Sequence, residues 1–362
     1  MNSHPTIPVQ QWGPAPAAPS FPILESKLTP APTRPGLVSR VQLLDWLEAS
    51  AATPVVAICG PAGYGKTMLA AEWAKRDPRP FVWLTIDRHD NDPAVLLTYL
   101  AVGLDRVEPI DASVLGMLAS RGVSVSQRVL PRLGAALAAK ALPVVLVLDD
   151  VDLLQDQQGL EAVAVLVDHL PAGSQLVVLS RGEPPLPVAR WRAEGRLAEL
   201  GPGELAMSPV EAESLLSAVR VELADAEVAE LTRRTEGWPV ALYLAALAHK
   251  AGGQPANAGF AFAGDDRFLA DYLHAELLAH LPTERVEFLT RTAVLDRLSG
   301  PLCDAILETS GSAAVLASLE RSNLLVVPLD RQREWYRYHP LFRELLRGEL
   351  ERQDPELAGE LA

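Results

Sequence analysis

The chain has 362 residues, of which 49% are hydrophobic, so it can bury more than one core and its length predicts two or three domains. Thirty-two Lys and Arg residues against 46 Asp and Glu residues give a net charge of −14, which excludes broad nonspecific binding to nucleic acid. Two cysteines exclude a disulfide framework, and no run reaches the roughly 18 apolar residues that span a bilayer. We expect a cytoplasmic, soluble chain with no membrane partner.

The N-terminal 35 residues contain nine of the chain's 30 prolines, which cannot donate hydrogen bonds to a helix or a sheet. We expect residues 1–26 to form a disordered, proline-rich tail. In the next stretch, GLVSRVQLLDWLEAS (36–50), Val41, Leu44 and Leu47 fall on one helical face. This spacing predicts a first helix with Arg40 at its entrance.

A glycine-rich turn follows in VVAICGPAGYGKTMLAAEWAKR (55–76), which begins as an apolar strand and ends as a helix. Its residues match G-x-x-x-x-G-K-[ST], in which backbone N–H groups surround the β-phosphate of a nucleotide, the lysine reaches the β and γ oxygens, and the hydroxyl ligates Mg²⁺. The predicted ATP or ADP contacts are Gly60, Pro61, Ala62, Gly63, Tyr64, Gly65, Lys66, Thr67 and Met68.

Strand and helix patterns alternate from residue 27 to residue 183. After the loop come the strands FVWLTID (81–87), PVVLVLDD (143–150) and QLVVLSR (175–181), separated by helical patterns near 91–104, 126–140 and 159–170. This alternation predicts an α/β P-loop NTPase domain over 27–183, with a parallel sheet covered by helices on both faces and its ligands at the carboxyl ends of the strands.

Three charged residues stand at such strand ends. Asp149 follows VVLVL, where a Walker B aspartate holds Mg²⁺ beside Thr67. Asp150 could polarise the attacking water, although a capping or solvated carboxylate is the plainer interpretation. Arg181 could sense the γ-phosphate, although a lone arginine at a strand end is usually solvated. With Lys66, these residues form the predicted catalytic set.

Helical patterns dominate from residue 184 onward, at 208–219, 225–250, 268–281 and 283–295. We expect a helical domain over 184–250, a Gly- and Ala-rich linker at 250–266, and a winged-helix domain over 251–350 closed by a hairpin of LLVVPLD and EWYRYH. Residues 351–362 are expected to form a tail. Taken alone, Trp238 and Pro239 are typical of a helix start, and His339 of an ordinary histidine.

Six strings, in order, carry a family resemblance: LVSR, GPAGYGKT, VLVLDD, VVLSRGEPPLPVARWRAEGRLAEL, TEGWPVAL and WYRYHPLFRELL. From about residue 27 to residue 350 the chain resembles the MalT-like STAND ATPases, the signal-transduction NTPases of large LuxR-type transcriptional regulators. The resemblance implies ATP-binding, helical and winged-helix domains that close over ADP. It also implies a GxP motif at Gly237 and Pro239.

The same resemblance implies roles for single residues. Pro239 would contact the adenine, Val38 and Arg40 would lie beside the base, His339 would approach the β-phosphate, and Arg181 would be the sensor. MalT-like regulators continue into a helical-repeat sensor and a helix-turn-helix beyond the strings matched here. From these 362 residues we therefore expect no direct DNA binding, but self-association with ATP and possible protein partners.

Two functions remain open at this point. One is a switch that ADP keeps closed and that ATP opens toward an oligomer, with slow turnover. The other is a turnover enzyme, either a constitutive P-loop ATPase or a small-molecule phosphotransferase, and it explains the loop equally well. It would require an acceptor pocket and rapid turnover without an inducer.

Overall fold

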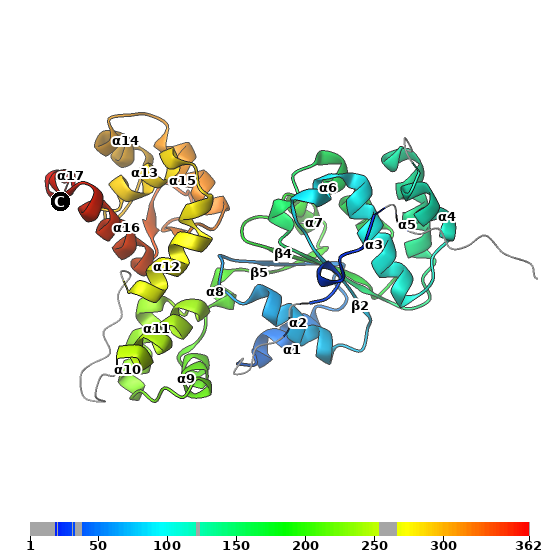
Figure 1. Ribbon diagram of the computed structural model, residues 1–362, viewed down its shortest axis with the longest axis horizontal. Coiled ribbons are helices and arrows are strands. Elements are labelled where there is room, and N and C mark those ends of the chain that lie inside the picture. The colour runs from blue at the N-terminus through cyan, green and yellow to red at the C-terminus, as the bar shows by residue number, and fades with distance from the viewer. Residues whose placement is uncertain are drawn as a thin grey trace, which may run out of the picture.

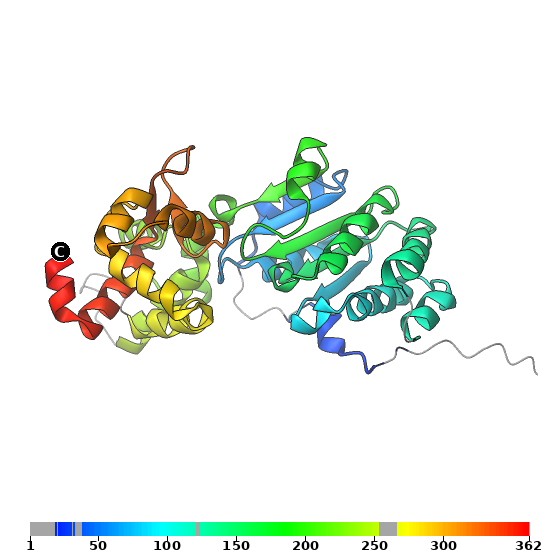
Figure 2. The same ribbon diagram turned by 90° about the horizontal axis from the view of Figure 1, so that it is seen from above.

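The computed structural model describes residues 19, 21–30, 32, 38–120, 124–252 and 266–361. A sheet domain forms one half of the molecule, and the other half, which lies beside it, consists almost entirely of helices (Figure 1). The two halves remain side by side in the perpendicular view (Figure 2). The contacts between the sheet domain and the helical half therefore matter for function.

Five parallel strands form the sheet of the first half, in the order β2-β3-β4-β1-β5. The strands are β1 (Val55–Cys59), β2 (Phe81–Thr85), β3 (Val145–Asp149), β4 (Gln175–Ser180) and β5 (Leu197–Leu200). β4 lies between β1 and β3, so the carboxyl ends of these three strands meet at one edge. This architecture confirms the predicted α/β P-loop fold.

The strand β5 was not predicted from the sequence. It has four residues, only one of them buried, and it pairs with β1 at the edge of the sheet through Val55 and Leu197. Such a short edge strand lacks the continuous apolar run of a central strand, which is why its pattern was weak. The sheet domain therefore extends beyond the expected boundary at residue 183.

Helices cover both faces of the sheet, as the alternation predicted. The helices α1 (Val41–Ala49) and α2 (Lys66–Arg76) share one buried cluster with Val56, Ile58 and Val177. The helices α3 (Pro93–Val107), α5 (Leu130–Ala138) and α6 (Gln157–Asp168) share the opposite cluster with Val55 and Ala57. Alternate strand residues serve opposite faces because side chains along a strand point to its two sides in turn. This half also contains the short helices α4 (Ala112–Leu118) and α7 (Val188–Ala193).

The helical domain follows β5. It contains α8 (Pro202–Leu205), α9 (Pro209–Ala218), α10 (Asp225–Thr235) and α11 (Pro239–Gly252). Ser208 and Glu211 form the capping box that starts α9, and Pro239 occupies the first turn of α11. Buried residues of α9, α10 and α11 belong to the same apolar cluster as α1 and α2, so this domain packs on the sheet domain through a continuous core.

The winged-helix part closes the chain. Its elements are α12 (Arg267–Glu276), α13 (Thr283–Thr292), α14 (Gly300–Leu307), α15 (Ser312–Arg321), the antiparallel strands β6 (Val326–Pro328) and β7 (Tyr336–Tyr338), and α16 (Pro340–Gln353). The hairpin confirms the predicted wing. A tail was expected at 351–362, but residues 351–361 form the end of α16 and, from Pro355 onward, a further helix, α17 (Pro355–Leu361).

Part of the expected N-terminal tail is ordered, so the prediction of disorder is wrong for residues 21–26. Phe21 and Ile23 pack against the core of the sheet domain. The buried Lys27 ammonium bonds the Asp90 carboxylate at 2.5 Å and lies 4.5 Å from the centre of the Tyr99 ring. Residues 1–18 and most of the predicted 250–266 linker lie outside the described residues.

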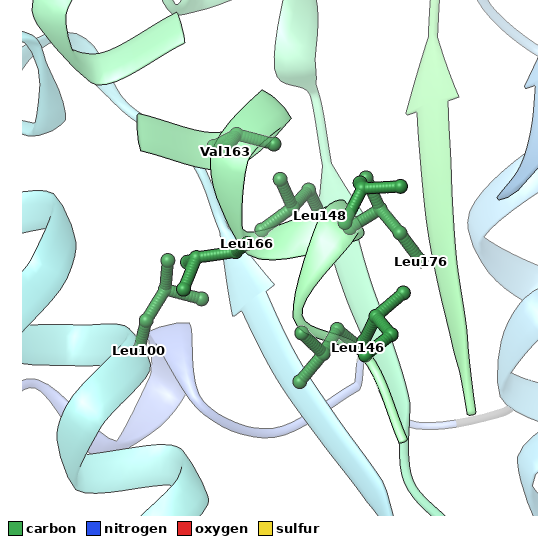
Figure 3. Close-up of a pocket in the computed structure, with 8 residues that line it drawn as sticks. Leu100, Leu146, Leu148, Val163, Leu166 and Leu176 are labelled. Carbon is green, nitrogen blue, oxygen red and sulfur yellow. The ribbon is translucent and has the colours of Figure 1, made fainter. Parts of the chain in front are cut away.

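Two features of this fold carry no functional argument. A space of about 10 Å³ lies between α3, α6 and the sheet and is lined only by aliphatic side chains, among them Leu100 and Leu148 (Figure 3). It is a packing gap of the core. In the described ranges no single helix is long and apolar enough to cross a bilayer, although α14 and α15, bent by 119° at their break, meet the length and composition criteria as a pair.

Candidate nucleotide-binding site

The glycine-rich loop joins β1 to α2 at the carboxyl edge of the sheet. Gly63 and Gly65 both have φ of 79°, a backbone conformation that disfavours side chains, and the Gly60 N–H bonds the Ser180 carbonyl of β4 at 3.1 Å. Gly65 directly precedes α2, so the positive end of the helix dipole points at the loop. The loop therefore has the shape and polarity of a phosphate cradle.

Lys66 places a cation inside this cradle. Its side chain is buried, and its Nζ atom donates to the carbonyls of Gly60 at 2.7 Å and Pro61 at 3.1 Å. Burial lowers the pKa of Lys66, and the nearby charge of Asp150 opposes that shift. An ammonium surrounded by backbone groups fits the phosphate oxygens of a nucleotide, which would take over its hydrogen bonds.

A hydroxyl and a carboxylate meet beside the lysine. Thr67 Oγ1 donates to Asp149 Oδ2 at 2.9 Å, although the two residues are far apart in sequence. Burial, aided by the charge of Asp150, raises the pKa of Asp149 to about 6. Mg²⁺ prefers such oxygen ligands and completes its shell with phosphate oxygens and water. The pair fits that ion, and no cluster of three or more His, Cys, Asp or Glu residues in the described ranges offers an alternative metal site.

Asp150 has an unusual backbone conformation for a residue with a side chain. Its φ is 55°, in the left-handed region, and its N–H bonds Asp149 Oδ1 at 3.0 Å. Burial, and then the charge of Asp152, raises its pKa, while Arg181 and Lys66 lower it. Asp150 thus lies among the charges of the site with its carboxylate free of the Thr67 contact.

Arg181 follows β4 and is turned toward the winged-helix part. Its Nη1 and Nη2 atoms donate to the main-chain oxygen and to Oε2 of Glu276, each at 3.2 Å. Its own N–H bonds Asp152 Oδ1 at 3.0 Å, and its carbonyl accepts from the Asn323 side chain at 2.8 Å. The predicted sensor is therefore held by contacts on both sides of the domain junction.

The helical domain reaches the loop through Trp238 and the first turn of α11. Trp238 Nε1 donates to the Ala62 carbonyl at 2.9 Å, and the Val240 N–H donates to the Gly63 carbonyl at 3.2 Å. The Trp238 ring is fully buried and stacks against Tyr64, with 6.3 Å between ring centres. The loop that shapes the phosphate site is thus also a docking surface.

The structure brings His339 to the loop only indirectly. Its ring lies 5.6 Å from the centre of the Trp238 ring, and its Nε2 atom lies 3.0 Å from the Thr235 carbonyl. His339 is 1% exposed, its Nδ1 atom has no hydrogen-bond partner among the residues that the structure describes, and burial lowers its pKa. Pro239 likewise lies next to, and not among, the direct loop contacts.

The residues predicted to lie beside the base are found near the start of α1. Val38 is half-buried against the core that joins the domains. Arg40 donates to Glu211 Oε1 at 2.7 Å and to the carbonyl oxygens of Leu205 at 2.8 Å and Ala206 at 3.1 Å. Arg40 therefore ties the start of α1 to the end of α8 and the start of α9, a contact that sequence reasoning did not find.

An open cleft of about 870 Å³ lies between the sheet domain and the winged-helix part. Its lining includes Pro61, Ala62, Asp150 and Arg181 from the sheet domain and Glu276 and Asn323 from the winged-helix part. Sequence reasoning missed Asp152 and Glu276 in this region. Asp152 had a signal, since it stands three residues after Asp149 in DDVD, whereas nothing in the sequence marked Glu276.

Two family models match the chain: the AAA ATPase domain over residues 39–179 and the MalT winged helix domain over residues 274–358. The fold and the loop thus define an ATPase domain of the P-loop class, joined to a winged helix, and this fold implies nucleotide binding. The chain is a MalT-like STAND ATPase region.

Named relatives agree with this assignment. The serine/threonine-protein kinase PknK of Mycobacterium tuberculosis is 32% identical over 96% of this chain and 32% of its own length. The HTH-type transcriptional regulator MalT of Vibrio cholerae is 31% identical over 90% of this chain and 37% of its own length. The chain thus spans about a third of the length of these curated relatives. A Walker-type ATPase of Pyrococcus abyssi shares the fold with a TM-score of 0.60 at 17% identity, covering 86% of this chain and 96% of that one.

Proposed function

We propose that this chain is a nucleotide-dependent switch of a LuxR/MalT-type transcriptional regulator. Bound ADP keeps the sheet, helical and winged-helix parts together, and exchange for ATP opens them toward an oligomer. The observation that carries the proposal is that Trp238 and Val240 hydrogen-bond the phosphate loop itself. Because the same loop would hold the phosphates, a change of nucleotide would act directly on the domain contact.

The names of the relatives support a role in control. PknK is a serine/threonine-protein kinase and MalT is an HTH-type transcriptional regulator, so regions similar to this chain occur in proteins with two different outputs. A shared region fits a control element better than it fits either output. We propose that the output regulated by this chain is DNA binding, which the helix-turn-helix of a longer protein would perform.

Each proposed nucleotide contact has a part in this switch. A nucleotide can shift the equilibrium between closed and open forms only by its different affinity for them. In the closed form Pro239 would contact the adenine, and Val38 and Arg40 would lie beside the base. His339 would act on the β-phosphate side through Trp238. Lys66, Thr67 and Asp149 would bind MgATP and MgADP alike.

Hydrolysis would reset the switch slowly. Asp150 would orient the attacking water, and Arg181 would stabilise the charge of the γ-phosphate. Both roles are supported by position, since the charges of Lys66 and Arg181 both act on the pKa of Asp150. Slow turnover fits an arginine that the closed form engages with Glu276.

The winged-helix part would act inside the chain and not on DNA. Two of its charged residues pair with the helical domain: Glu344 bonds Arg234 at 3.1 Å, and Arg337 bonds Glu236 at 2.8 Å. While it holds Glu236, Arg337 does not neutralise backbone phosphates, on which DNA affinity depends. Self-association with ATP, and protein partners, would then be the outputs of this region.

The first test identifies the nucleotide that the protein carries. The chain would be purified without added nucleotide and denatured, and the released nucleotide would be identified by chromatography. Lys66→Ala would run in parallel with Lys250→Ala, which removes an exposed lysine outside the loop. We expect stoichiometric ADP in the wild type and in Lys250→Ala, none in Lys66→Ala, and a larger sedimentation coefficient with ATP than with ADP.

The cleft of about 870 Å³ beside Asp150 favours one alternative, a constitutive ATPase or a phosphotransferase with a small acceptor. That function predicts an empty site after purification and several turnovers per minute without an inducer. If the purified protein has an empty site and also turns over several times per minute without an inducer, the chain is an enzyme and not a switch. An empty site without turnover would leave only a nucleotide-binding scaffold, and the switch would be refuted.

A further inference from the structure

Glu276 is the last residue of α12 and makes two contacts with the proposed sensor. Arg181 Nη1 donates to the Glu276 main-chain oxygen, and Nη2 donates to its carboxylate, each at 3.2 Å. The main-chain oxygen belongs to the last turn of a helix, where carbonyl groups lack helical partners and carry the negative end of the dipole. Glu276 thus offers the guanidinium two negative groups at once.

The backbone of this segment is fixed independently of that ion pair. The Arg181 carbonyl accepts from Asn323, and the Glu183 N–H donates to the Arg321 carbonyl at 3.1 Å. Gly182 packs so closely that an added Cβ would lie 2.3 Å from the Arg321 oxygen. The guanidinium can therefore exchange partners while the segment keeps its place.

We propose that Glu276 determines the preference of this chain for ADP over ATP, by holding the guanidinium that a γ-phosphate would otherwise recruit. The inference rests on the proposed function. ADP leaves the contact between Arg181 and Glu276 intact. A third phosphate beside Lys66 presents a stronger anion to Arg181 and also repels the Glu276 carboxylate, so binding ATP costs the contact that joins the winged-helix part to β4.

The surroundings of the pair fit such an exchange. The side chains of Arg181 and Glu276 are 40% and 39% exposed, so water can replace either partner and the ion pair is weak. The charges of both residues act on Asp150, which places the pair within the electrostatic reach of the catalytic carboxylates. The same two charges act on Tyr272, which also packs against the loop at Gly63.

The test measures the affinities of ATP and ADP separately by calorimetry, with Mg²⁺, for the full 362-residue chain. Glu276→Gln keeps the size of the side chain and the main-chain oxygen but removes the charge. We expect it to raise the ATP affinity relative to the ADP affinity by about three- to fivefold. Glu287→Gln removes an exposed carboxylate that pairs within α13 and should leave the ratio unchanged.

Arg181→Ala completes a double-mutant cycle. In that background Glu276→Gln should change the ratio by less than about twofold, because the carboxylate has lost its partner. Small-angle scattering gives a second readout, the radius of gyration. It should increase at a lower ATP concentration in the Glu276→Gln variant than in the wild type.

Two results would overturn the inference: an unchanged ratio of the ATP and ADP affinities, or an effect of Glu276→Gln that persists without Arg181. If the wild type binds both nucleotides and Lys66→Ala binds neither, such a result removes only the role of Glu276. A wild-type chain that binds neither nucleotide would refute the proposed function and, with it, this inference.

Discussion

Replacing Trp238 by phenylalanine tests the link between the helical domain and the phosphate loop. The variant keeps an aromatic ring in the fully buried position but removes the N–H that bonds the Ala62 carbonyl at 2.9 Å. Leaving a buried acceptor without its partner costs about 1–3 kcal/mol. With about 2 kcal/mol lost from the closed form only, the equilibrium between closed and open forms shifts by about 30-fold, since 1.4 kcal/mol is tenfold.

The assay is the release of fluorescent ADP from the loaded protein after mixing with excess unlabelled nucleotide. We expect Trp238→Phe to release ADP about ten- to thirtyfold faster than the wild type, following the shift in the closed population. Trp191→Phe is the matched control, because Trp191 is equally buried but belongs to the sheet domain core. Equal release rates in Trp238→Phe and the control would refute the argument that this hydrogen bond couples the domain contact to the nucleotide.

Three further predictions concern stability, metal and pH. Gly237→Ala should lower the free energy of unfolding by about 2–4 kcal/mol in urea titrations, because φ is 71° and the new Cβ would lie 2.4 Å from the Met207 carbonyl oxygen. The control is Gly203→Ala, whose added Cβ would meet no atom within 4 Å and which should cost about 1 kcal/mol or less. Asp149→Asn should abolish the gain in nucleotide affinity on adding Mg²⁺ but change the affinity in EDTA by less than about twofold; an undiminished Mg²⁺ effect would exclude Asp149 as a ligand. Burial lowers the pKa of His339 below its usual value of 6.5. Below pH 6.5 the imidazole is therefore protonated in the unfolded chain but stays neutral in the folded chain, so the free energy of unfolding falls as the pH falls. Between pH 7.5 and 5.5, urea titrations should show that His339→Gln loses less free energy of unfolding than the wild type, with a difference of up to about 1.4 kcal/mol per pH unit below 6.5. If the free energies of unfolding of both proteins fall in parallel with pH, the buried imidazole is not neutral.

Much of the site could be predicted because its chemistry is local. A phosphate cradle needs consecutive backbone groups, so Gly60 to Thr67 could be recognised from spacing alone. Asp149 could be placed as well, because an apolar strand ending in a carboxylate brings it to the edge where the loop lies. The parallel sheet and the closing hairpin followed from the alternation of strand and helix patterns and from two short strand patterns near the end. These predictions needed no knowledge of which distant residues touch.

The partners of the loop and of the sensor depended on the tertiary structure. Trp238 and Ala62 are 176 residues apart, and Arg181 and Glu276 are 95 apart, so no local pattern relates them. The order of the strands, the edge strand β5 and the packing of residues 21–26 on the core were also decided by long-range packing. The sequence by itself determined that the chain has a P-loop and a parallel sheet, because periodicity and spacing specify local backbone geometry. Which domain holds the loop was decided by burial and hydrogen bonding between segments that only the folded chain brings together.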